Sequence, residues 1–124
     1  MEALAETKLI HRDLASRNVL VFKYNPRDPT GTSVKVADFG LTVNTNTGRT
    51  HAYVTGGPLP TRWLAPEALR KGRYSEKSDV WSFGVLCWEV ATNVDIPFFE
   101  KPDDEAVSAH VMQGSHGKCA LPPA

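Results

Sequence analysis

The hydrophobic residues of the chain gather in short stretches that are separated by turn-forming residues. Residues 19–22 (Val-Leu-Val-Phe) and 34–37 (Val-Lys-Val-Ala) are rich in β-branched and aromatic side chains, a composition typical of β-strands. Between them, residues 24–32 contain Asn-Pro and Asp-Pro-Thr-Gly, which are typical of turns. The pattern therefore predicts a hairpin of two strands joined by a long surface turn.

The longest apolar run lies inside a stretch that predicts a helix from Ser75 to about Thr92. Ser75 is a good N-cap. The apolar residues that follow it point in nearly every direction, so we expect a helix that is buried on most sides. Cys87, in the same run, is expected to be a small buried hydrophobe. Asp79 is the exception, because a buried carboxylate needs hydrogen-bond partners.

Shorter elements are predicted on either side of this helix. Residues 1–8 are rich in helix formers and predict the end of a helix. Residues 66–71 begin with proline and are followed by glycine, which predicts a short helix. Residues 102–114 open with acidic side chains and predict a further helix that ends at Gly114. Residues 41–62 show no periodicity and predict an irregular loop.

Four short motifs occur along these elements in a fixed order. Residues 11–18 read His-Arg-Asp-Leu-Ala-Ser-Arg-Asn, which fits the frame H-R-D-L-x-x-x-N. Residues 38–40 read Asp-Phe-Gly, residues 65–67 read Ala-Pro-Glu, and residues 78–85 read Ser-Asp-Val-Trp-Ser-Phe-Gly-Val. In sequence, order and approximate separation these motifs resemble those of protein kinases. The resemblance identifies residues 11–18 as the catalytic loop and residues 38–67 as the activation segment.

The resemblance implies a role for each polar residue around the catalytic loop. Asp13 would accept the proton of the substrate hydroxyl, and Arg17 would steady either this base or the transferring phosphate. Asn18 and Asp38 would hold Mg²⁺, and Leu20 would form the floor of the adenine pocket. The implied cofactors are therefore ATP and Mg²⁺.

Other residues would support or regulate this site. The resemblance implies that Asp79 accepts hydrogen bonds from the catalytic-loop backbone around His11 and Arg12. Tyr53, the tyrosine of the activation segment, is a candidate for autophosphorylation, and its phosphate could pair with Arg12. An ordinary exposed loop tyrosine is the alternative for Tyr53. The resemblance also assigns structural support to the following residues: His11, Phe39, Gly40 and Glu67.

Two places in the sequence resemble tyrosine kinases rather than serine/threonine kinases. The position two residues after Asp13 is Ala15, where serine/threonine kinases usually carry lysine, and a basic residue follows at Arg17. Residues 60–63 read Pro-Thr-Arg-Trp just before Ala-Pro-Glu, which is similar to the tyrosine-kinase pattern. A phenol reaches further than a serine side chain, so a rigid proline with an apolar ring suits the wall that holds a tyrosine substrate. The sequence therefore indicates a protein tyrosine kinase.

The implied fold class is α+β, a protein-kinase-like fold. Residues 1–124 would form part of its mostly helical C-terminal lobe, with a small β-hairpin beside the active site. No G-x-G-x-x-G loop and no strand lysine precede the catalytic loop, so we expect the N-terminal lobe that grips ATP to be missing from this chain. The alternative function is a truncated or pseudokinase-like lobe that only binds partners. The intact His-Arg-Asp and Asp-Phe-Gly triplets disfavour that alternative.

Composition limits the class of protein to which the chain can belong. The chain is 41% apolar and 23% charged, as in ordinary globular proteins, and its formal net charge of zero gives no nucleic-acid signature. Two cysteines give no disulfide framework, and no signal-peptide pattern occurs. We therefore expect a cytoplasmic protein, or the cytoplasmic side of the plasma membrane for a receptor. Its expected partners are ATP and a protein substrate with a tyrosine acceptor.

Overall fold

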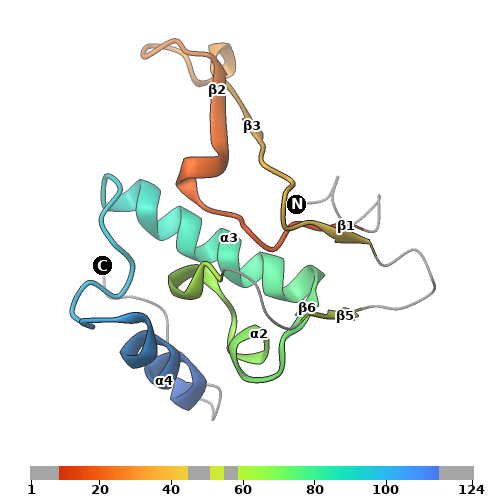
Figure 1. Cartoon of the computed structure of the whole chain (residues 1–124). Helices are drawn as coiled ribbons and strands as arrows, with labels where there is room; N and C mark the ends of the chain where they lie inside the picture. Colours follow the sequence, from red (N-terminus) through yellow and green to blue (C-terminus); the bar gives the residue numbers. More distant parts are fainter. Residues whose placement is uncertain (1–8, 45–50, 55–58, 115–124) are drawn as a thin grey trace.

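The computed structural model describes residues 9–44, 51–54 and 59–114 (Figure 1). In these residues the strands form three separate two-stranded antiparallel sheets. Strand β1 (Leu9–Ile10) pairs with β4 (Val43–Asn44), and β2 (Val19–Lys23) pairs with β3 (Ser33–Val36). The predicted hairpin is therefore present, and the residues between its strands include a short 3-10 helix, η2 (Pro29–Gly31).

The third sheet joins residues 51–53 to the helical part of the chain. Strand β5 (His51–Tyr53) pairs with β6 (Arg73–Ser75), so that Ala52 lies opposite Tyr74 and Tyr53 lies opposite Arg73. The prediction of an irregular loop over residues 41–62 is wrong at β4 and β5. These strands form because they pair with β1 and β6, and the local sequence pattern does not reveal pairing with distant strands.

The α-helices of the described residues are α2 (Pro66–Lys71), α3 (Glu76–Ala91) and α4 (Asp104–Gly114). Helix α3 begins where the sequence predicts, because the Ser75 hydroxyl accepts the backbone N–H groups of Lys77 and Ser78 while Ser78 returns a bond to the Ser75 backbone. In Figure 1, α3 runs through the middle of the molecule, with the β2–β3 hairpin on one side and α2 and α4 on the other. None of the helices in the described ranges is long and apolar enough to cross a membrane.

Among the described residues, two clusters of buried apolar side chains lie in the core. The first joins Ile10, Leu64, Ala68 and Tyr74, so it ties β1 to α2, β6 and the residue that precedes the Ala-Pro-Glu triplet. The second joins Phe98, Val107 and Val111 and holds α4 in place. The first cluster packs Ile10, just before His11, against Leu64, just before the Ala-Pro-Glu triplet, and so joins these two parts of the chain.

Gly72 fixes the junction between α2 and β6. Its backbone is left-handed, with φ of 64°, and its N–H closes the last turn of α2 on the carbonyl of Ala68. A Cβ atom at this position would lie 2.4 Å from the carbonyl oxygen of Val54, whose own N–H donates to the Gly72 carbonyl at 2.9 Å. Glycine therefore allows the β5 end to approach the end of α2.

The prediction that the long helix is buried on most sides is wrong for one side of α3. Val80, Phe83 and Val90 are 51%, 42% and 71% exposed, and Cys87 is exposed rather than buried. At Phe83, Cys87 and Val90 the reason is that a cavity of about 580 Å³ separates this side of α3 from the hairpin. Its lining residues are Ser16, Val19, Val21, Val34, Val36, Phe83, Leu86, Cys87 and Val90. The hairpin stands away from the helix here and does not cover it.

Candidate active site

Asp79 anchors the loop that the sequence identifies as catalytic. Its two carboxylate oxygens accept the backbone N–H groups of His11 at 2.8 Å and Arg12 at 3.0 Å, which are the bonds that the kinase resemblance implied. The side chain is buried, and burial raises the pKa of Asp79, although the two N–H groups act to lower it. Arg12 has a left-handed backbone with φ of 71°, so this carboxylate also holds a strained turn in place.

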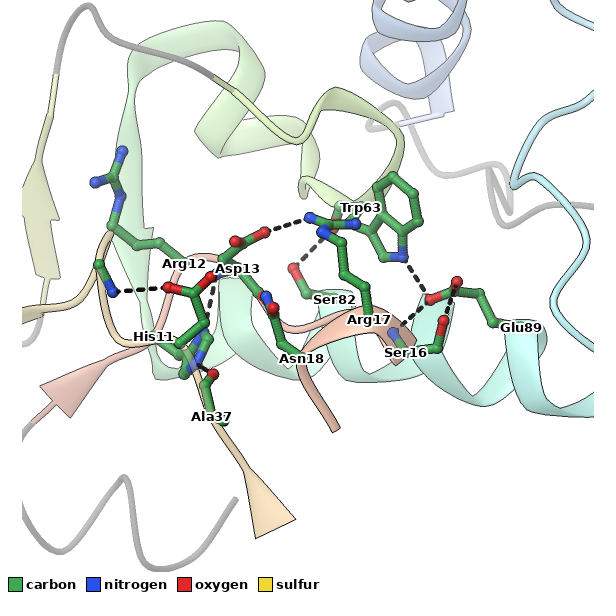
Figure 2. A network of polar contacts seen from close by, with 12 residues as sticks. His11, Arg12, Asp13, Ser16, Arg17, Asn18, Ala37, Trp63, Ser82 and Glu89 are labelled. Atoms are coloured by element: carbon green, nitrogen blue, oxygen red, sulfur yellow. Dashed lines mark hydrogen bonds and ion pairs between the residues drawn. The ribbon is translucent and has the colours of Figure 1, made fainter. Parts of the chain in front are cut away.

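His11 connects the catalytic loop to the Asp-Phe-Gly triplet. Its Nδ1 accepts the backbone N–H of Asp13 at 3.1 Å, so the ring proton sits on Nε2 and is donated to the carbonyl of Ala37 at 2.9 Å. The His11 ring also lies 5.0 Å from the ring of Phe39, between centroids. One buried imidazole therefore links the backbone of Asp13 to that of Ala37, the residue before Asp38 (Figure 2).

Asp13 is fixed on its backbone and on its side chain. The Asn18 side-chain amide donates to the Asp13 carbonyl at 2.7 Å, and the Arg17 guanidinium forms an ion pair with the Asp13 carboxylate. The carboxylate borders an open cavity of about 420 Å³, whose other lining residues are Arg17, Asp38, Gly40, Leu41, Leu59 and Pro60. The structure thus places the predicted base, its arginine and one predicted metal ligand around a single cavity.

Two oxygen donors close to Asp13 fit a magnesium ion: Asp38 lines the cavity, and Asn18 is bonded to the Asp13 backbone beside it. Asn18 uses its amide N–H in the bond to Asp13, which leaves its carbonyl oxygen available, and Asp38 is an exposed carboxylate. No cluster of three His, Cys, Asp or Glu side chains suited to a metal occurs in the described parts of the chain. Mg²⁺ is typically bound by one or two protein oxygens together with substrate phosphates and water, and Asn18 with Asp38 supply that number.

Trp63 and Glu89 belong to the same network, although the sequence analysis gave Glu89 no role. The Glu89 carboxylate accepts the Trp63 indole N–H at 2.7 Å and the backbone N–H of Ser16 at 2.9 Å, as Figure 2 shows. The Arg17 guanidinium lies 4.5 Å over the Trp63 ring. The sequence feature that could have identified Glu89 is an acidic residue inside an apolar helical run, the same feature that singled out Asp79.

Arg62 holds the residues that the sequence assigns to the tyrosine-binding wall. Its guanidinium donates to the carbonyls of Pro97 at 2.8 Å, Phe98 at 2.9 Å and Lys101 at 3.2 Å. These bonds tie η3 (Thr61–Trp63) to the segment before α4. The segment that follows Leu59 and Pro60 is therefore fixed by hydrogen bonds to residues 97–101.

The structure does not bring Tyr53 to Arg12, and the pairing of a Tyr53 phosphate with Arg12 stays a prediction. The Arg12 guanidinium lies 4.3 Å over the ring of buried Tyr74 and donates to the Leu41 carbonyl at 3.0 Å. Tyr53 is 61% exposed and pairs in the ladder with exposed Arg73. Because neighbouring residues of a strand point to opposite faces, Tyr53 and Arg12 lie on opposite faces of the β5–β6 sheet.

Two other predicted residues lie outside the Asp13 cavity. Leu20 is on β2 and is 49% exposed. Glu67 is half-buried in the first turn of α2. Neither lines the cavity around Asp13, so their assigned roles remain predictions.

Comparison with known proteins identifies the class of protein to which this site belongs. A family model described as protein tyrosine and serine/threonine kinase matches residues 1–122, and the chain therefore belongs to the protein kinase family. The chain is also 40% identical, over 125 aligned residues, to fibroblast growth factor receptor homolog 2 of Drosophila melanogaster. The alignment covers 98% of this chain but 11% of the relative, so the chain spans about a tenth of that protein's length.

Proposed function

We propose that this chain carries the base and the metal-binding residues of a protein tyrosine kinase, which transfers the γ-phosphoryl group of ATP to a tyrosine hydroxyl. The observation that carries the proposal is the position of Asp13. Its carboxylate faces an open cavity that Asp38 also lines, while its backbone N–H and C=O are fixed by His11 and Asn18.

In this mechanism Asp13 accepts the proton of the substrate hydroxyl as the hydroxyl oxygen bonds to the γ-phosphorus. The bond between the γ-phosphorus and its bridging oxygen breaks, and that oxygen leaves with ADP. Arg17 keeps the Asp13 carboxylate oriented toward the cavity. Asn18 and Asp38 would hold Mg²⁺, which supplies charge neutralisation of the phosphates when it is bound.

Tyrosine specificity rests on the opposite wall of the cavity. Leu59 and Pro60 line it together with Asp13, and the bonds of Arg62 hold this wall in place. A rigid apolar wall matches the flat apolar ring of a tyrosine and leaves its hydroxyl to reach the base. The 40% identity to a protein named as a growth factor receptor also supports tyrosine specificity.

We also infer that residues 1–124 are part of the C-terminal lobe of a longer kinase domain, with the catalytic loop at 11–18, the activation segment at 38–67 and the central helix at α3. The name of the matched relative favours a receptor and thus a position on the cytoplasmic side of the plasma membrane. Signalling through a protein substrate is part of the same proposal.

A chimaeric kinase tests the proposal directly. Residues 1–124 replace the aligned segment in the kinase domain of the fruit-fly relative, and the purified chimaera is given Mg²⁺, ATP and peptides with tyrosine or with serine and threonine as acceptors. We expect phosphate on the tyrosine peptides alone. Preference for serine and threonine would overturn the specificity, and a folded chimaera with no transfer would favour a non-catalytic binding module.

A further inference from the structure

The Glu89 carboxylate joins two segments that form opposite sides of the proposed active site. Oε1 accepts the backbone N–H of Ser16 at 2.9 Å and the indole N–H of Trp63 at 2.7 Å, and Oε2 accepts the Ser16 hydroxyl at 2.6 Å. Glu89 is 3% exposed. One buried acid on α3 therefore fixes both the catalytic loop and the residue that precedes Leu64 and the Ala-Pro-Glu triplet.

Helix α3 holds Trp63 by its indole N–H and by its backbone carbonyl. Glu89 accepts its indole N–H, and the Ser82 hydroxyl donates to its backbone carbonyl at 2.7 Å. Both partners belong to α3, as Figure 2 shows. The plane of the Trp63 ring is thus set by the helix and not by the loop that carries it.

The Arg17 guanidinium packs against the face of the Trp63 ring. Its guanidinium stacks at 4.5 Å over the Trp63 ring while it pairs with the Asp13 carboxylate. The Arg17 side chain is 46% exposed, and an exposed ion pair alone holds two side chains in one geometry only weakly. Stacking of the planar guanidinium on a fixed ring restricts its rotamers and so restricts where Asp13 can point.

We propose that Glu89 is a positioning residue of the kinase reaction: it fixes Trp63 and Ser16, Trp63 fixes Arg17, and Arg17 fixes the Asp13 carboxylate at the cavity. The inference rests on the proposed function of Asp13. It assigns no contact with substrate to Glu89. It differs from a purely structural role, in which loss of Glu89 weakens the fold without acting through Arg17.

A double-mutant cycle in the chimaera separates these two roles. The variants are Glu89→Gln, Arg17→Lys and the double variant, and kcat for a tyrosine peptide and KM for ATP are measured well below each variant's melting temperature. We expect each single change to lower kcat by about 10- to 100-fold, as for other residues that orient catalytic groups. We expect the double variant to be no slower than the slower single variant, because the residues act as one unit. The KM for ATP should stay within about 2-fold, since no contact with ATP is assigned to these residues.

Val85→Ala is the matched control. Val85 is fully buried on the same helix, and its apolar side chain forms none of the hydrogen bonds of this network, so its loss should lower the melting temperature and leave kcat at low temperature unchanged. If Glu89→Gln does not fold, Trp63→Phe serves in its place, because it removes the indole N–H and keeps a ring. It too should lower kcat, and combining it with Arg17→Lys should cause no further loss.

The outcomes distinguish the inference from the function on which it rests. An active unmodified chimaera in which the effects of Glu89→Gln and Arg17→Lys multiply would overturn the role of Glu89 alone. The same holds if Glu89→Gln behaves like Val85→Ala. An unmodified chimaera that folds but transfers no phosphate would overturn the proposed function and this inference with it.

Discussion

The Asp79 carboxylate accepts the backbone N–H of His11 at 2.8 Å, although 68 residues separate the two in the sequence. His11 in turn binds the Asp13 backbone N–H and the Ala37 carbonyl. A single acid in α3 therefore sets the position of the loop that carries the proposed base and of the segment that carries Asp38.

The pH dependence of stability should report on Asp79. Burial raises its pKa above the ordinary value of 3.8, so the folded state takes up a proton at higher pH than the unfolded state does. This contribution to the free energy of unfolding is fully present below pH 3.8 and is lost as the pH rises through the raised pKa. Melting temperatures of the chimaera and its Asp79→Asn variant should therefore diverge, in favour of the unmodified protein, as the pH falls toward about 4. A difference in melting temperature that does not change with pH would contradict the raised pKa of Asp79.

Gly72→Ala should destabilise the junction between α2 and β6. The left-handed backbone costs an alanine roughly 1–2 kcal/mol, and the new Cβ would lie 2.4 Å from the Val54 carbonyl oxygen. Gly84→Ala is the control, because a Cβ there meets no atom of the described residues within 4 Å. Denaturant unfolding of both variants in the chimaera checks the prediction. An equal effect at the two glycines would show that the clash at Gly72 is relieved without cost.

Residues 1–124 expressed alone should bind a hydrophobic dye and show no thermal shift with Mg²⁺ and ATP. Val80, Phe83 and Val90 on α3 are exposed, and so are Val21 and Phe22 on the hairpin; exposed apolar surface of this kind promotes dye binding and association. Dye fluorescence and a calorimetric scan test this. A sharp melt of a soluble monomer that Mg²⁺ and ATP stabilise would contradict it.

A phosphate on Tyr53 should form an ion pair with Arg73. Residues directly opposite in an antiparallel pair have Cβ atoms about 4.5–5.5 Å apart, so a phosphate on Tyr53 can reach the Arg73 guanidinium. We expect mass spectrometry to find phosphate on Tyr53 after incubation of the chimaera with Mg²⁺ and ATP, and phosphorylation to raise the melting temperature. Arg73→Gln should remove that rise, whereas Lys71→Gln, with the same loss of charge, should retain it. No phosphate on Tyr53 would refute the assignment.

The sequence predicts local elements of this structure better than it predicts which side of an element is buried. Ser75 marks the start of α3 because capping is a local interaction. The exposure of Cys87 could not be predicted, because the apolar residues around it point in every direction and only packing selects the buried side. The hydrogen bonds of Glu89 were missed for a related reason, since its partners Ser16 and Trp63 lie 73 and 26 residues away.

The most direct test of the central claim is the rate of phosphoryl transfer in the Asp13→Asn chimaera. Asparagine keeps the shape of the side chain but cannot accept the proton, so with saturating Mg²⁺ and ATP the single-turnover rate on a tyrosine peptide should fall by about 10²- to 10⁴-fold. The melting temperature should stay close to that of the unmodified chimaera, because the backbone bonds of Asp13 to His11 and Asn18 do not involve its carboxylate. A transfer rate within a few-fold of the unmodified rate, in a folded variant, would contradict the assignment of Asp13 as the base.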